Sequence, residues 1–65
     1  MSEYKYHYEI VDRGGCVIDT AQDMLMRNIM LNFLINYHGL TWYNERGVKA
    51  VRKRITKQEW KERYC

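Results

Sequence analysis

Polar and apolar residues alternate at the beginning of the chain. Four apolar or aromatic residues stand two positions apart, with polar residues between them: Tyr4, Tyr6, Tyr8 and Ile10. This period of two predicts a β-strand with an aromatic face, which cross-strand packing alone would explain. Residues 12–15 supply a turn with two glycines, and residues 16–18 return as a second strand. The chain is therefore expected to begin with a β-hairpin.

A helix is expected over residues 21–38. Most of these residues are good helix formers, and Gly39 stands where a left-handed residue often ends a helix. Thr20 and Asp23 resemble a short capping box at its start. At about 100° per residue, the apolar side chains form two arcs. The first holds Met26, Ile29, Met30, Phe33 and Tyr37, and the second holds Met24, Leu31 and Ile35.

A helix with apolar residues on two sides needs two apolar partners. The sheet can cover one side. A homodimer seam or a contact with another protein through Met24, Leu31 and Ile35 would cover the other. The alternative is that a C-terminal helix folds over that side. Between the two arcs runs a stripe of Asn28, Asn32 and Asn36, which is either a solvated face or a set of hydrogen-bonding groups for a partner.

The C-terminal part of the chain is harder to assign. Residues 40–43 are β-prone, residues 44–47 suit a turn, and residues 48–55 fit either a strand or a helix. The segment from Thr56 to Glu59 is a complete capping box, so a new helix should begin at Lys57 and the preceding run should be a strand. If residues 44–55 were helical instead, this half would be a helix-turn-helix candidate.

The expected fold is a small α+β domain in the order ββαββα, with the central helix packed on an antiparallel sheet. The 65 residues leave room for one domain, with a hairpin-helix body over 1–44 and a basic hairpin-helix over 45–65. A chain of this size buries a modest core and often depends on a second subunit or another partner.

Charge divides the same two parts. Residues 45–65 hold eight Lys and Arg against three Glu, a net charge of +5, while residues 1–44 carry −2. A basic third of this kind attracts nucleic acid or an acidic protein surface. The expected anion-binding residues are Arg46, Lys49, Arg52, Lys53, Arg54, Lys57 and Lys61, with aromatic contacts from Trp42, Tyr43 and Tyr64. Trp60 is expected to enter the core.

Read as a strand, residues 48–55 place Arg52 and Arg54 on one face and Lys49 and Lys53 on the other. A central strand could not bury both pairs, so an edge strand is expected. Cations on an edge discourage aggregation, which is a sufficient structural explanation. The functional alternative is contact with phosphates, to which an aromatic side chain would add stacking on unpaired bases.

The sequence contains little that would indicate a catalytic site, a cofactor site or a metal site. His7 and His38 have no partner at a spacing typical of a proton relay, and the spacing of these histidines from Cys16 and Cys65 is unlike that of zinc sites. Arg13-Gly14-Gly15 lacks the residues of a phosphate-binding loop. No apolar segment resembles a signal peptide or a membrane span, and two cysteines are too few for a disulfide framework. A cytosolic, non-enzymatic protein without a cofactor is therefore expected.

Two function hypotheses remain. In the first, the protein is an interaction protein whose basic third docks on an anionic site of a larger protein or nucleoprotein machine and inhibits or modulates it. In the second, it is a small, dimeric regulator that binds DNA or RNA. The cations are mixed with Glu45, Glu59 and Glu62, and no base-recognition motif accompanies them, which favours the first hypothesis.

In its general character, the chain resembles the free-standing small proteins common in phages and other mobile elements. It begins with Met1, is rich in tyrosine and is expected to have no leader. The resemblance covers no motif. What it implies, as one concrete case of the first hypothesis, is an anti-CRISPR-like inhibitor of a host defence nuclease.

Overall fold

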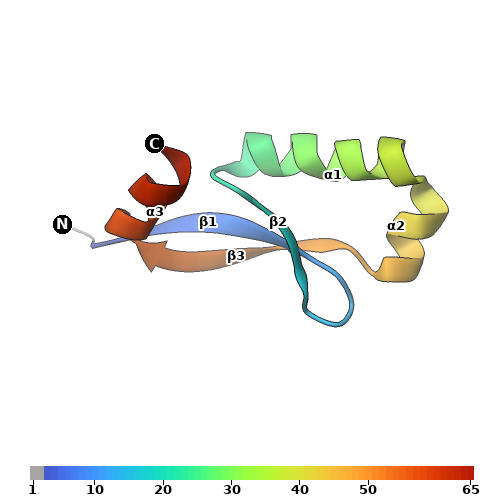
Figure 1. Cartoon of the computed structure of the whole chain (residues 1–65), viewed down its shortest axis with the longest axis horizontal. Coiled ribbons are helices and arrows are strands. Elements are labelled where there is room, and N and C mark those ends of the chain that lie inside the picture. The colour runs from blue at the N-terminus through green and yellow to red at the C-terminus, as the bar shows by residue number, and fades with distance from the viewer. Residues whose placement is uncertain (1–2) are drawn as a thin grey trace.

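The computed structural model describes residues 3–65 as a three-stranded antiparallel sheet with three helices (Figure 1). In chain order the elements are β1 (Tyr4–Val11), β2 (Val17–Ala21), α1 (Met24–His38), α2 (Leu40–Arg46), β3 (Lys49–Thr56) and α3 (Lys57–Tyr64). The sheet order is β2-β1-β3, so β1 is the central strand. The expected α+β class is confirmed.

The N-terminal hairpin forms as expected, with small differences at its ends. The turn is closed by the backbone N–H of Asp12, which donates to the carbonyl of Cys16 at 3.1 Å, and Gly15 adopts a φ of 84°. The returning strand β2 begins at Val17 and extends to Ala21, which lies opposite Tyr8. Because Ala21 is buried within the sheet, the helix cannot begin there.

Helix α1 begins three residues later than expected. Asp23 is its N-cap, and its carboxylate Oδ1 accepts from the backbone N–H of Met26 at 2.9 Å. Thr20, the expected cap, lies in β2. The expected end at His38 is confirmed, because the N–H of Gly39 donates to the carbonyl of Ile35 at 2.8 Å. Gly39 has a positive φ of 93°, but its ψ of 154° lies outside the left-handed helical region that was expected.

The expected strand over residues 40–43 is wrong. These residues belong to α2, which ends at Gly47 in the left-handed conformation with a φ of 64°. Packing outweighs the β-propensity of Trp42 and Tyr43. Both side chains contact the hydrophobic core from α2, a helix that follows α1 directly. A turn was expected over residues 44–47, but residues 44–46 complete α2.

Strand β3 and helix α3 follow the sequence prediction closely. β3 is an edge strand, as expected, and its presence removes the helix-turn-helix alternative for residues 44–55. Thr56 caps α3, because its hydroxyl oxygen accepts from the backbone N–H of Glu59 at 3.1 Å. The capping box therefore marks the strand-to-helix boundary correctly.

The hydrophobic core is small and lies toward the α2 end of the molecule. Ile10, Leu34 and Val48 form its buried cluster, against which Met30, Leu31, Trp42, Tyr43 and Ala50 pack. The molecule measures 43 × 21 × 16 Å, and its radius of gyration of 12.8 Å exceeds the ~10.7 Å of a compact domain of this length. Much of the sheet and of α1 therefore stays at the surface.

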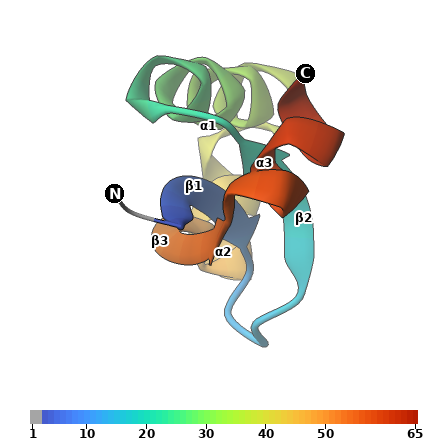
Figure 2. The same cartoon turned by 90° about the vertical axis from the view of Figure 1, so that its left-hand side faces the viewer.

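Helix α3 lies at the opposite end, as seen in Figure 1 and from that end in Figure 2. It packs on β1 and β3, and within residues 3–65 it does not pack on α1. The possibility that a C-terminal helix covers the second apolar side of α1 is thus excluded for the described chain. Trp60 is half-buried rather than a core residue, with the Nζ of Lys5 3.8 Å from its ring centroid.

Adjacent residues of α1 provide a test of this packing. Leu34→Ala should lower the free energy of unfolding by about 2–5 kcal/mol, because it leaves a cavity beside Ile10 and Val48. Phe33→Ala should change it by no more than about 0.5 kcal/mol, because Phe33 is 60% exposed whereas Leu34 is 9% exposed. Urea denaturation followed by circular dichroism measures both. Equal destabilisation by the two substitutions would contradict the assigned orientation of α1.

Candidate functional site

The most distinctive surface of the molecule is a set of paired tyrosines and arginines on one face of the sheet. The guanidinium of Arg54 lies 4.6 Å from the ring centroid of Tyr4, and that of Arg52 lies 4.5 Å from Tyr6. Arg27 of α1 lies 4.9 Å from the ring of Tyr8. We call these six residues the tyrosine–arginine ladder.

The register of β1 with β3 builds the ladder. Tyr6 lies opposite Arg54 and Tyr8 opposite Arg52, so all four side chains leave the same face of the sheet. Each arginine then reaches diagonally to the tyrosine one pair further along, which is within range of long side chains. A shift of the register by one residue would move the arginines to the other face.

Arg27 completes the ladder from the helix. Its Nε and Nη2 donate to the side-chain oxygen of Asn28 at 3.1 and 3.0 Å, which holds the guanidinium plane. Asn28 is the first residue of the asparagine stripe, so one member of that stripe has a positioning role. Asn32 and Asn36 are exposed.

The ladder is accessible because α1 covers only part of the sheet. Tyr4 and Tyr6 are 45% and 53% exposed, and Arg52 and Arg54 are exposed as well. Beside Tyr6 and Tyr8, a hollow of about 480 Å³ opens between the sheet and the first residues of α1, with Gln22 and Met24 among its lining residues. Figure 1 shows the β1–β3 ribbon continuing past the start of α1 toward α3.

The expected anion-binding residues divide among several surfaces. Arg52 and Arg54 belong to the ladder, whereas Lys49 and Lys53 lie opposite Val11 and His7, on the other face. Arg46 ends α2, with its guanidinium 5.6 Å from the ring of Trp42. The seven cations therefore do not form one continuous patch.

A second, smaller basic surface lies at α3. Lys5, Lys57 and Lys61 surround Trp60 and Cys65 at a hollow of about 280 Å³. Two of these lysines were expected to bind anions, and Lys5 joins them from β1. This lysine hollow lies at the same end of the molecule as Tyr4, because Tyr4 pairs with Thr56 immediately before α3.

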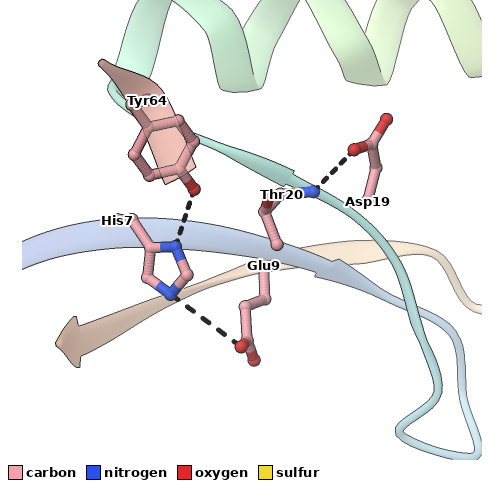
Figure 3. A network of polar contacts seen from close by, with 5 residues as sticks. All are labelled: His7, Glu9, Asp19, Thr20 and Tyr64. Atoms are coloured by element: carbon pink, nitrogen blue, oxygen red, sulfur yellow. Dashed lines mark hydrogen bonds and ion pairs between the residues drawn. The ribbon is translucent and has the colours of Figure 1, made fainter. Parts of the chain in front are cut away.

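The expected aromatic contacts have other surroundings. Trp42 and Tyr43 are half-buried against the core. The hydroxyl of Tyr64 shares a hydrogen bond of 2.8 Å with Nδ1 of His7 (Figure 3). These side chains support the fold, and the exposed aromatic surface of the sheet comes from β1 instead.

His7 is fully buried and connects β1 to α3. Its Nε2 lies 3.8 Å from Oε2 of Glu9 and has no hydrogen-bond partner among the described residues (Figure 3). The nearby carboxylate favours the tautomer with its proton on Nε2, so that Nδ1 accepts from the Tyr64 hydroxyl. Burial lowers the pKa of His7 below its usual 6.5, and Arg63 lowers it further, against the opposing effects of Glu9 and Glu59.

Helix α1 also presents an uncovered apolar surface. Four side chains, each one turn apart and each more than half exposed, form an apolar ridge: Leu25, Ile29, Phe33 and Tyr37. The rings of Phe33 and Tyr37 stack with their centroids 5.6 Å apart. The ridge contains no charged side chain, and the asparagine stripe runs beside it.

The three expected interface residues lie around this ridge and not along it. Met24 is exposed at the start of α1, but Leu31 packs against the core and Ile35 is half-buried. Their role at an interface stays a prediction. The helix does have a second apolar side that the described residues leave without a cover, as expected, but this side is the ridge, because the core takes Leu31 from the other arc.

Within residues 3–65, no group of three or more His, Cys, Asp or Glu residues could hold a metal ion. Cys16 and Cys65 are exposed free thiols. None of the helices in the described range is long and apolar enough to cross a membrane.

The sequence pattern did not single out Tyr4, Tyr6, Tyr8 and Arg27 as binding residues. The sequence does contain a signal for the ladder: tyrosines stand two positions apart in residues 4–8, and arginines stand two positions apart in residues 52–54. One antiparallel register of the two strands places these tyrosines opposite these arginines. That register was not known from the sequence. The contribution of Arg27 has no comparable signal, because it depends on where α1 crosses the sheet.

Comparison of the chain with protein-family models, with curated proteins and with solved structures finds no match. The functional assignment therefore rests on the site itself.

The burial of His7 predicts how the stability of the fold depends on pH. Because the folded state binds a proton less readily than the unfolded state, stability should fall as pH drops below 6.5 toward the lower pKa of the folded protein. The contribution of His7 to the slope of the unfolding free energy against pH should not exceed about 1.4 kcal/mol per pH unit, the value for one proton. His7→Asn, which retains an acceptor toward Tyr64, should abolish this contribution. Urea denaturation between pH 7.5 and about 5 measures it, and an equal slope in both proteins would contradict the assignment.

Proposed function

We propose that this chain is a small non-enzymatic interaction protein that docks on an anionic site of a nucleic-acid-handling protein or nucleoprotein machine and modulates it. The observation that supports this proposal is the tyrosine–arginine ladder. Arginine offers planar, multiple donors to carboxylates and phosphates, and a tyrosine beneath each guanidinium restrains its orientation. An anti-CRISPR-like inhibitor of a nuclease is one concrete form of this function.

The apolar ridge supports a protein component in the partner. Its aromatic and aliphatic side chains project from α1 without a charge among them, which suits the desolvated centre of a protein interface. A phosphate backbone is charged, so it would make few favourable contacts with this apolar surface. Ladder and ridge together give the molecule one electrostatic and one apolar contact surface.

A second candidate is a nucleic-acid-binding regulator that acts without a protein machine. The exposed rings of Tyr4 and Tyr6 favour it, because aromatic side chains beside arginines are common where proteins hold unpaired bases. In this case the ridge would serve as the seam of a homodimer. The two candidates share the ladder as the anion-binding surface.

Strand β3 offers a matched test of that surface. Arg52→Ala/Arg54→Ala and Lys49→Ala/Lys53→Ala each remove two cations from the same strand, but from opposite faces. Elution from a heparin column measures polyanion binding. The arginine variant should elute at clearly lower salt than the lysine variant, although both have the same net charge.

Equal elution of the two variants would show that net charge alone governs binding and would contradict the proposal. Earlier elution of the lysine variant would assign the site to the opposite face. Circular dichroism of each variant confirms that the fold is intact before the comparison is made.

A further inference from the structure

The spacing of the ladder carries information about its ligand. Tyr4, Tyr6 and Tyr8 follow each other along one face of β1, so their Cα atoms stand about 6.7 Å apart, twice the rise of an extended strand. Beside each ring lies one guanidinium, at 4.6, 4.5 and 4.9 Å from the ring centroid. The surface therefore repeats an aromatic and a cationic group together.

A double helix does not suit the aromatic part of this surface. The faces of its paired bases are hidden within the stack, so rings on the protein cannot reach them. In an unpaired, extended strand the bases separate and their faces become available for stacking on aromatic rings or guanidinium planes.

The surroundings of the ladder suit the two parts of a nucleotide differently. Arg52 and Arg54 supply donors at the exposed edge strand, where a phosphate backbone can pass. The hollow beside Tyr6 and Tyr8 is lined by Met24 and by Gln22, which offer an apolar wall and an amide for a base edge. Asp23 and Arg52 also line this hollow, so it carries charges of both signs, whereas Arg54 stands on the edge strand without an acidic neighbour in that lining.

An acidic peptide is the competing ligand. It would use the guanidinium groups, but it would gain little from three tyrosines at a regular spacing. We infer that the tyrosine–arginine ladder binds single-stranded nucleic acid, with bases stacked along β1 and phosphates held by Arg52 and Arg54. The inference rests on the proposed function, since it names the anionic ligand of the same site.

Fluorescence anisotropy with labelled oligothymidylate of about ten nucleotides tests it, beside a hairpin duplex with the same number of phosphates, in about 50 mM salt. The single strand should bind at least ten-fold more tightly than the duplex. Tyr6→Leu should weaken single-strand binding about five-fold or more, the low end for one lost stack. Val17→Ala, which removes an exposed apolar side chain of β2 outside both the ladder and the apolar ridge, should leave the affinity unchanged.

Equal or tighter binding of the duplex would overturn the inference, and so would equal effects of Tyr6→Leu and Val17→Ala. If Tyr6→Leu fails to fold, Tyr4→Leu at the end of the ladder gives the same comparison. Absence of oligonucleotide binding, together with heparin retention that still depends on Arg52 and Arg54, would overturn the inference alone and point to an acidic protein site. Heparin retention independent of these arginines would contradict the proposed function as well.

Discussion

The antiparallel pairing of β1 with β3 is the constraint on which the rest of the structure depends. It spans all eight residues of each strand and joins segments that are far apart in the sequence. Its register brings Ile10 and Ala50 together at the core and places Tyr6 and Tyr8 among arginines at the other end. The same pairing thus produces both the packed end of the molecule and its cation–aromatic face.

The small core explains why so much chemistry remains at the surface. Packing centres on Ile10, Leu34 and Val48, and α1 leaves part of the sheet, including Tyr4 and Tyr6, exposed. The remaining length of the β1–β3 ribbon has α3 as its main support, through the His7–Tyr64 hydrogen bond and the Lys5–Trp60 contact. An elongated molecule with a limited core and two uncovered surfaces is well suited to work against a partner.

The sequence predicted the elements with strong local signals and failed where tertiary contacts decide. The alternation at Tyr4–Val11 and the capping box at Thr56 led to correct assignments, because each depends on neighbouring residues. Residues 40–43 were assigned wrongly, because burial of Trp42 and Tyr43 against the core outweighs their β-propensity. The charge pattern pointed to Arg52 and Arg54, but their tyrosine partners follow from a long-range register that no local signal fixes.

The most direct measurement is an NMR titration of the arginine side-chain Nε–H signals with a short heparin oligosaccharide. The central claim is that the tyrosine–arginine ladder is the anion-binding surface. We expect the signals of Arg27, Arg52 and Arg54 to shift first and furthest, because these guanidiniums lie over β1. Larger shifts at Arg13, Arg46 or Arg63, with those of the ladder unchanged, would contradict the claim.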